Sequence, residues 1–377
     1  MYKPLGKNIY AYDVNSLYPF VMKTCPVPVG NITFFEGDIS KIDNNPFGFF
    51  EVEIIAPDNL NIPILQTKIN TGNGTRTVSP LGQWKYMMFS EEMNNALKFG
   101  YRFKILRGYL FEKEYIFTDY INDLYEIKKA HNKNDPMYLI SKLLMNSLYG
   151  RFGMDYRMSE HLIIDNNQLY NIIDKYSINE VIELNNDKSL VSYLDNDLLE
   201  TIFLSNKSDF NISIGIASAI TSYSRVHMSQ FKSINNDFNL YYTDTDSIYI
   251  DKPLDDSFIS NELGKMKLEY IFDEAVFLAS KVYGGVIENS SKEIIKIKGF
   301  KNKISYDLLK SLLIKDNKLE LNQDKWFKNI EEGNITIKNQ IYTLIPTENK
   351  RQLIYKNNEL VDTKPFVIDI NKEIDSK

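Results

Sequence analysis

The stretch Tyr241–Ile250 carries two carboxylates between two short runs of strand-forming residues, with Thr-Asp-Thr-Asp as a tight connection at its centre. Asp244 and Asp246 are two positions apart, so extended backbone would point both to the same side. Two such acids repel each other unless a cation lies between them. The stretch therefore indicates a Mg2+ site, with a solvated hairpin turn as the alternative. A calcium loop is excluded, because Ile248 and Tyr249 stand where a ligand and a glycine are needed.

A third carboxylate stands near the beginning of the sequence. Residues Ile9 to Asp13 form a short strand pattern that ends on this acid, and the chain then turns through Pro19 into a possible helix. An aspartate at a strand end, followed by a turn that offers backbone N–H groups, suits a metal that also holds a phosphate. The alternative is that Asp13 is a plain helix cap.

A predicted helix presents a set of side chains that could bind a nucleotide. Asp135–Pro136 predicts its start, with an acceptor at the cap and proline at the first helical position. Lys142, Asn146 and Tyr149 are spaced by four and three, so they share one helix face. A cation for phosphate, an amide and a ring for a base or sugar are what a nucleotide needs. Gly150 would allow close approach, although an ordinary amphipathic helix that stops at a glycine is the alternative.

The rest of the sequence predicts the elements that position these residues. Prolines punctuate short strands between residues 27 and 83, which indicates a β-rich insertion. An acidic, Asn-rich stretch from about 154 to 205 predicts a second, hairpin-like insertion. A Lys-, Ile- and Asn-rich tail of helices and short strands follows residue 300. We expect helices at 90–100, 118–131, 214–231 and 273–280, and strands at 102–110 and up to 299.

Composition sets limits on the class of protein. The 377 residues are 43% hydrophobic, enough for a sizeable core and more than one domain. The single Cys25 excludes a disulfide framework and a cysteine zinc site, and the three histidines are scattered. The N-terminal residues do not form a signal peptide, and no apolar run is long enough to span a bilayer. We therefore expect a soluble intracellular protein that does not bind a membrane.

Charge is unevenly distributed along the chain. The net charge of −6 counts mildly against nucleic-acid binding by the protein as a whole. Lysines nevertheless cluster between Lys292 and Lys303, and local charge matters more for a groove that follows phosphates. Lys296 and Lys298 alternate on a predicted strand beside Gly299, which favours phosphate contact over a merely solvated lysine face.

Three of these stretches together resemble the conserved motifs of family B DNA polymerases. Asp-Val-Asn-Ser-Leu-Tyr-Pro at 13–19 resembles motif A, and the segment 142–150 resembles motif B. Tyr-Thr-Asp-Thr-Asp-Ser at 242–247 resembles motif C. Each motif is moderately specific, and their occurrence in this order makes the resemblance strong.

Further matches point to the protein-primed members of that family. Thr221 to Arg225 resembles their Thr-x-x-(Gly/Ala)-Arg motif, with Ser224 in place of the small residue. Lys281 to Tyr283 resembles their Lys-x-Tyr motif, and residues 296–299 fit the approach to their thumb. The resemblance is strongest to polymerases of linear mitochondrial plasmids and protein-primed phages. It implies a mitochondrial, plasmid-encoded protein, with phage-infected bacterial cytoplasm as the alternative.

The resemblance implies an α+β right-hand fold with an antiparallel-sheet palm, helical fingers, a small thumb and two β-rich insertions. It divides the chain into palm (1–25), an insertion resembling terminal-protein region 1 (26–89), fingers (90–153), an insertion resembling terminal-protein region 2 (154–210), palm (211–303) and thumb (304–377). Such polymerases carry a 3′–5′ exonuclease domain before motif A, whereas Met1 lies only a few residues before it here. We therefore expect the polymerisation half alone, without proofreading.

The implied reaction is template-directed addition of dNMP to a 3′-hydroxyl by two-metal phosphoryl transfer. Asp13 and Asp246 would hold two Mg2+ ions, for which Mn2+ can substitute, with the Val14 carbonyl assisting and Asp244 nearby as a third catalytic carboxylate. The partners would be primer–template DNA, dNTPs and a terminal protein whose side-chain hydroxyl primes synthesis.

The resemblance also implies roles for the remaining site residues. Ser16 and Leu17 would offer backbone N–H groups to the triphosphate, and Tyr18 would lie under the sugar and exclude a 2′-hydroxyl. Lys142 would neutralise the triphosphate, Asn146 would orient it, and Tyr149 would pack on the nascent base pair. The residues expected to contact primer and template are Gly150, Thr221, Arg225, Lys281, Tyr283, Lys296 and Lys298.

Two other functions stay open from the sequence. The chain could be a catalytically incomplete fragment or relic that only binds primer–template DNA. It could also be a metal-dependent nuclease that uses two carboxylates on a phosphodiester, but that function would leave Lys142, Asn146, Tyr149 and Tyr18 without a role.

Overall fold

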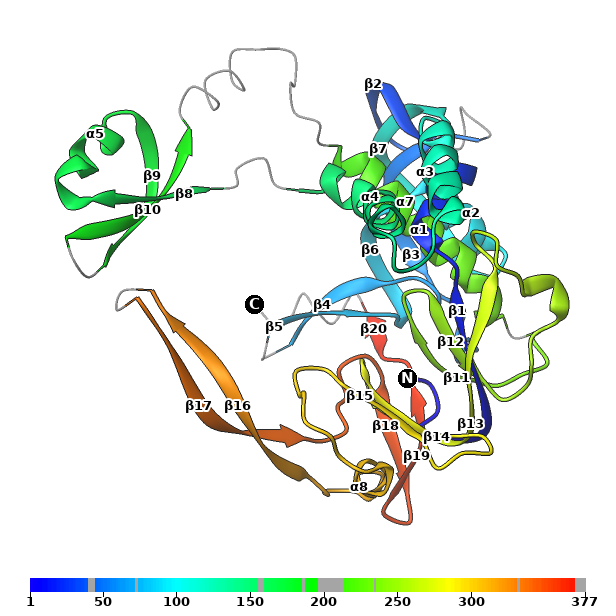
Figure 1. Ribbon diagram of the computed structural model, residues 1–377. Coiled ribbons are helices and arrows are strands. Elements are labelled where there is room, and N and C mark those ends of the chain that lie inside the picture. Colours follow the sequence, from blue (N-terminus) through cyan, green and yellow to red (C-terminus); the bar gives the residue numbers. More distant parts are fainter. Residues whose placement is uncertain are drawn as a thin grey trace. The chain divides into compact units, whose positions relative to one another are not determined.

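The computed structural model describes residues 1–39, 45–71, 74–154, 159–184, 187–195, 213–233, 235–330 and 333–369. These residues form two compact units (Figure 1). The first unit contains Met1–Tyr149, Gly215–Leu319 and Thr343–Lys377, and the second contains Gly150–Ile214 and Glu320–Tyr342. The carboxylates of interest all lie in the first unit.

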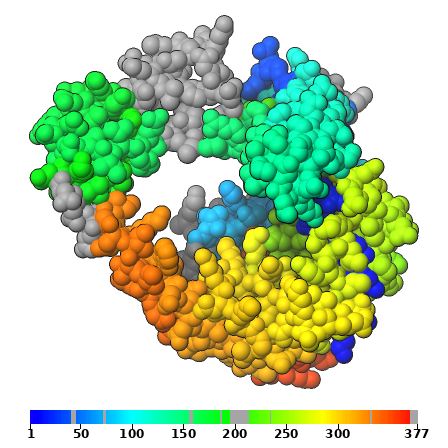
Figure 2. Space-filling model, viewed as in Figure 1, coloured from blue at the N-terminus to red at the C-terminus, as the bar shows by residue number. Residues whose placement is uncertain are grey.

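A six-stranded antiparallel sheet forms the centre of the first unit, with the strand order β11-β12-β1-β13-β14-β15. Its strands are β1 (Leu5–Val14), β11 (Leu240–Asp244), β12 (Ser247–Ile250), β13 (Met266–Ala279), β14 (Val282–Ile287) and β15 (Glu293–Ile297). Strand β1 pairs with β12 on one side and β13 on the other. In Figure 2, dark blue patches of the N-terminal residues are visible beside the yellow-green surface.

The expected helix at 273–280 is wrong, because these residues belong almost entirely to strand β13. Val276, Phe277 and Leu278 are consecutive and fully buried. A run buried on both faces fits a central strand, and here β13 pairs with β1 and with β14. Tertiary burial therefore overrides the local preference of this segment.

Helices at 90–100, 118–131 and 214–231 are confirmed within a few residues. Helix α4 begins as predicted, because the Met137 N–H donates a hydrogen bond to Asp135 Oδ1 at 2.8 Å. The Thr118 hydroxyl donates to the Lys23 carbonyl at 3.1 Å, which ties the start of α3 to the end of α1. The helices are α1 (Leu17–Thr24), α2 (Ser90–Leu97), α3 (Thr118–Ala130), α4 (Pro136–Phe152), α5 (Leu169–Ile173), α7 (Ile214–Ser229) and α8 (Tyr306–Ser311).

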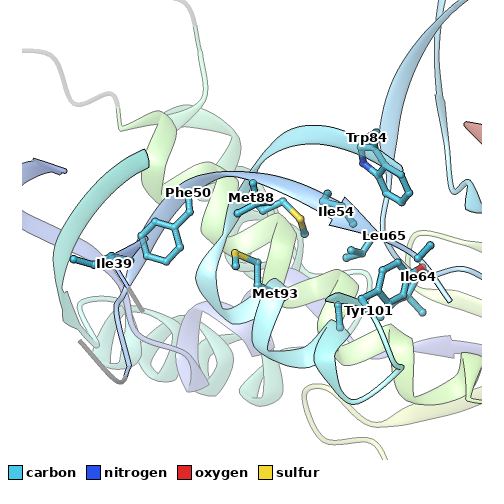
Figure 3. Close-up of a cluster of buried hydrophobic side chains, with 12 residues drawn as sticks. Ile39, Phe50, Ile54, Ile64, Leu65, Trp84, Met88, Met93 and Tyr101 are labelled. Atoms are coloured by element: carbon cyan, nitrogen blue, oxygen red, sulfur yellow. Dashed lines mark hydrogen bonds between the residues drawn. The ribbon is translucent and has the colours of Figure 1, made fainter. Parts of the chain in front are cut away.

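A second sheet in the first unit has the order β2-β7-β3-β6-β20. Its strands are β2 (Val27–Glu36), β3 (Gly48–Ile55), β6 (Leu81–Phe89), β7 (Arg102–Glu114) and β20 (Val367–Asp369), and the hairpin β4 (Thr67–Thr71)–β5 (Gly74–Val78) lies between β3 and β6 in the chain. Figure 3 shows part of its core, where Phe50, Ile54, Trp84 and Met88 pack with Met93 of α2. The β-rich character of this region is confirmed, and the sheet also takes in β7 and β20 from outside residues 26–89.

The second unit is also largely β-structure. Its three-stranded sheet has the order β8-β10-β9, formed by β8 (Glu160–Asp165), β9 (Tyr176–Leu184) and β10 (Lys188–Asp195). Residues 155–158, 185–186 and 196–210 of the expected insertion at 154–210 lie outside the described residues. The expected tail of helices and short strands contains α8 followed by strands β16 (Leu319–Asn329), β17 (Asn334–Leu344), β18 (Gln352–Lys356) and β19 (Glu359–Lys364).

Candidate active site

Two half-buried carboxylates meet where two neighbouring strands end. Asp13 near the end of β1 pairs with Ser247, the first residue of β12. The Val14 N–H donates to the Asp246 main-chain carbonyl at 2.9 Å, which fixes the turn against β1. Burial raises the pKa of Asp13 to about 7, and the Asp246 carboxylate adds to that rise. Burial also raises the pKa of Asp246.

This pair fits a divalent cation, because a positive charge would offset both desolvation and mutual repulsion. No group of three or more His, Cys, Asp or Glu side chains in the described part of the chain is arranged to hold a metal ion. Asp13 and Asp246 are the side chains that could hold such a cation, and main-chain oxygens such as the Val14 carbonyl and oxygens of a bound nucleotide could complete the set.

Asp244 lies in a different environment from Asp246. The Lys281 Nζ lies 2.7 Å from Asp244 Oδ2, and the Tyr242 hydroxyl donates to the same oxygen at 3.4 Å. Thr245 has a φ of 53°, so the backbone between the two acids is a left-handed turn. The premise that both acids lie on extended backbone is wrong, and within the described residues Asp244 is the one of the two acids that pairs with a lysine.

An aromatic cluster supports the motif C turn. The rings of Tyr242, Tyr249, Phe277 and Tyr283 pack with centroid distances between 5.2 and 6.1 Å. The Tyr249 hydroxyl donates to the Tyr283 hydroxyl at 2.8 Å, and the Lys281 N–H donates to the Tyr242 hydroxyl at 2.8 Å. The structure thus packs the partly buried Tyr283 against this cluster, whereas Lys281 is exposed and pairs with Asp244.

The motif A turn leads directly into α1. Ser16 has a φ of 53° and stands before Leu17, the first helical residue. The first N–H groups of a helix lack intrahelical partners, so this turn can donate to phosphate oxygens. Asn15 Nδ2 donates to the Ser260 carbonyl at 2.7 Å and holds the turn against the segment before β13.

Motif A and motif B meet through two aromatic rings. Tyr18 of α1 stacks on Tyr149 of α4 with a centroid distance of 4.2 Å and an interplanar angle of 24°. Burial raises the pKa of Tyr18 to about 12, and Tyr149 adds to the rise. The pair forms an apolar surface next to the acidic turn, of the kind that a sugar or base can pack against.

On helix α4, Lys142 is exposed and Asn146 is half-buried. Burial lowers the pKa of Lys128 in α3, and the nearby Lys142 ammonium lowers it further. The two lysines therefore lie close together. Sequence reasoning missed Lys128, whose only signal was its place one helix before Lys142. Lys128 also lines a cavity of about 320 Å3 with Asn15, Lys129, Lys133 and Tyr138.

A larger cavity, of about 480 Å3, lies beside the β11–β12 turn. The cavity is lined by residues from three separate sequence motifs, namely Tyr18, Thr221, Arg225 and Asp244. Its wall also contains three basic residues that sequence reasoning missed, namely Lys232, Lys350 and Arg351. Lys296 and Lys298 are exposed but do not line this cavity.

The fold is that of the right-hand polymerases. The structure of Phi29 DNA polymerase complexed with primer–template DNA matches it with a TM-score of 0.66 at 18% identity, over 90% of this chain and 58% of that one. The expected α+β right-hand fold is thereby confirmed. The family model for DNA polymerase type B, organellar and viral, matches residues 1–238, and the chain belongs to that family.

Two curated relatives are fungal. A probable DNA polymerase of Neurospora intermedia is 44% identical over 353 residues, which cover 90% of this chain and 35% of the relative. A probable DNA polymerase of Ascobolus immersus is 40% identical over 377 residues, covering 99% of this chain and 31% of the relative. The chain thus spans about a third of the length of these relatives. Within its described residues, no helix has the length and apolar character needed to cross a membrane.

Proposed function

We propose that this chain carries the polymerisation site of a protein-primed DNA polymerase, which adds dNMP to a 3′-hydroxyl under the direction of a template. The observation that carries the proposal is the meeting of Asp13 and Asp246 beside the Tyr18–Tyr149 stack. An acid pair suited to metal ions and an aromatic surface suited to a nucleotide are the two parts that phosphoryl transfer onto a growing strand requires.

The carboxylates of Asp13 and Asp246 would hold two Mg2+ or Mn2+ ions, with the Val14 carbonyl as a further ligand. When bound, such ions activate the primer hydroxyl and stabilise charge on the leaving pyrophosphate. Asp244, paired with Lys281, would support the turn and the local charge balance rather than carry an unpaired charge.

The incoming dNTP would lie between motif A and helix α4. The N–H groups of Ser16 and Leu17 and the ammonium of Lys142 would bind its phosphates, and Asn146 would orient them. Tyr18 would contact the sugar where a 2′-hydroxyl would project, and Tyr149 would pack on the new base pair. Lys128, adjacent to Lys142, strengthens the positive potential at this position.

Primer–template DNA would lie along the 480 Å3 cavity and the lysines beyond it. The residues proposed to contact it are Gly150, Thr221, Arg225, Lys281, Tyr283, Lys296 and Lys298. We extend the proposal to the division into palm (1–25 and 211–303), fingers (90–153), thumb (304–377) and two terminal-protein regions (26–89 and 154–210), to a terminal protein as primer, and to a mitochondrial, plasmid-encoded origin.

A DNA-binding fragment without autonomous catalysis is the second candidate, and the observation in its favour is that the chain spans about a third of its curated relatives. A nuclease is less favoured, because hydrolysis of a phosphodiester does not require the Tyr18–Tyr149 stack.

Extension of a labelled primer on a short template, with Mg2+ and dNTPs, tests the proposal. We expect stepwise extension and pyrophosphate release by the wild type and loss of both in Asp246→Asn. Asp273→Asn, which changes an exposed acid on neighbouring β13, is the matched control and should remain active. DNA binding without extension by the wild type would favour the binding fragment, and shortening of the primer without dNTPs would favour the nuclease.

A further inference from the structure

A bidentate ion pair joins helix α2 to helix α7. Arg225 Nε and Nη2 each donate to a carboxylate oxygen of Glu92 at 2.7 Å. The Nη2 group also donates to Ser222 Oγ at 2.8 Å. Glu92 is only 7% exposed, so its negative charge is buried and depends on this guanidinium. Local sequence patterns do not reveal the pair, since 133 positions separate the two residues.

The pair leaves one edge of the guanidinium available. Guanidinium carries five N–H donors in a rigid plane, and Nε and Nη2 account for three of them. Among the described residues, none accepts a hydrogen bond from Nη1. Arg225 also lines the 480 Å3 cavity together with Tyr18, Thr221 and Asp244. Fixing two nitrogens of the plane on Glu92 therefore fixes the direction in which the third one points.

The charges around the cavity indicate what Nη1 would meet. Lys232, Lys350 and Arg351 lie in the same wall, and Asp244 is already paired with Lys281. An oxyanion is the ligand that suits such a wall. Because the triphosphate of the dNTP is proposed to lie between motif A and helix α4, the oxyanions left for this wall are strand phosphates. The position of Arg225 beside Tyr18 places such a phosphate near the end of the growing strand.

We propose that Glu92 is a positioning residue, which holds Arg225 so that its Nη1 edge binds a phosphate oxygen of the primer strand next to Tyr18. This inference rests on the proposed polymerase function. An unheld arginine loses side-chain entropy when it binds, whereas the ion pair has already ordered this one. Glu92 also neutralises part of the arginine charge, so that the contact becomes directional.

The alternative is that Glu92 only fastens α2 to α7, and the chain offers a control for this. Asn95 Nδ2 donates to Ser229 Oγ at 2.9 Å, which links the same two helices one turn further along. Asn95→Ala would weaken the helix contact and leave the guanidinium held. Glu92→Gln keeps the shape of the side chain but has only one oxygen to accept the two donors.

The test compares the Kd for a fluorescent primer–template, measured by anisotropy, with the urea midpoint of unfolding for the same variants. We expect Glu92→Gln and Glu92→Ala to raise this Kd roughly tenfold, the effect of one charged hydrogen bond, and Asn95→Ala to leave it unchanged. The variant Arg225→Ala should raise the Kd equally, and Glu92→Ala combined with Arg225→Ala should raise it no further.

Equal Kd values for the Glu92 variants and Asn95→Ala would overturn the inference, as would additive effects of Glu92→Ala and Arg225→Ala. Glu92→Gln keeps the test decisive if Glu92→Ala fails to fold. Anisotropy needs no catalysis, so an inactive wild type would count against the proposed function and leave the positioning role measurable by the same Kd values.

Discussion

Lys281 Nζ lies 2.7 Å from the carboxylate of Asp244, whereas no lysine or arginine forms an ion pair with Asp13 or Asp246 in the described part of the chain. The acids of one short turn therefore differ in their environment. One is neutralised by the protein itself, and the other faces the second half-buried acid of the site.

Replacing Lys281 should affect activity more than stability. The two side chains of the ion pair are 56% and 26% exposed, so Lys281→Met should lower the free energy of unfolding by less than about 1 kcal/mol. Extension should slow markedly, because the charge of Asp244 would then add to the repulsion between Asp13 and Asp246. Urea unfolding and primer extension measure the two effects, and unchanged extension would contradict this account.

The Tyr18 ring should determine which sugar is accepted. In Tyr18→Ala the stack on Tyr149 disappears, and we expect the ratio of ribonucleotide to deoxyribonucleotide insertion to rise at least tenfold, the effect of removing a clash of about 1.4 kcal/mol. Tyr18→Phe keeps the ring and serves as the control. Single insertions of rNTP and dNTP give the ratio, and equal ratios in the Ala and Phe variants would assign discrimination elsewhere.

A side chain added at Gly150 should affect the stability of the protein and its affinity for DNA in different ways, and the two effects can be measured separately. Among the described residues, nothing outside the local helix lies within 4 Å of where a Cβ would stand. Gly150→Ala should therefore stabilise helix α4 by about 0.5–1 kcal/mol. If DNA approaches this backbone closely, the Kd for primer–template should rise in the same variant. A more stable protein with unchanged DNA affinity would remove Gly150 from the proposed contact surface.

His227 should make stability depend on pH. Burial lowers its pKa below the ordinary 6.5, while its Nε2–H donates to the Gly264 carbonyl at 3.1 Å and its ring packs on Phe20. The unfolded chain therefore binds a proton at a higher pH than the folded protein. The stability contribution is complete above pH 6.5 and is lost as the pH falls from 6.5 through the lower folded pKa.

Urea unfolding at about pH 7.5 and about pH 5.5 measures this effect, and His227→Gln, which retains a side-chain donor for Gly264, is the comparison. We expect the free energy of unfolding to fall more steeply on acidification in the wild type than in the variant. Equal slopes would show that other groups set the acid response.

Local patterns in the sequence predict most of the elements that carry the candidate site. A strand that ends on Asp13, a helix that starts after Asp135 and a hairpin around Asp246 are each specified by residues close together in the chain. The hydrophobic periodicity and the capping residues of these elements are strong signals, because local sterics and local hydrogen bonds determine such elements.

Contacts between distant residues could not be found in this way. The pairing of β20 with β6 joins Val367 to Leu81, and the Glu92–Arg225 ion pair joins two separate helices. Neither leaves a periodic signal in the sequence. The failed helix at 273–280 has the same origin, because the partners of β13 decide its conformation.

Strand β1 has a consequence for how the protein is made. The Tyr12 hydroxyl accepts a hydrogen bond from the Leu254 N–H, 242 positions later in the chain, and both edges of β1 pair with strands from that later part. A ribosome therefore releases this apolar strand long before either neighbour exists. Because the contacts of β1 are non-local and form late, folding is slow. Until they form, the unpaired edges of β1 can associate with other nascent chains. A holdase chaperone during synthesis, or dilution during refolding, should raise the yield of native protein.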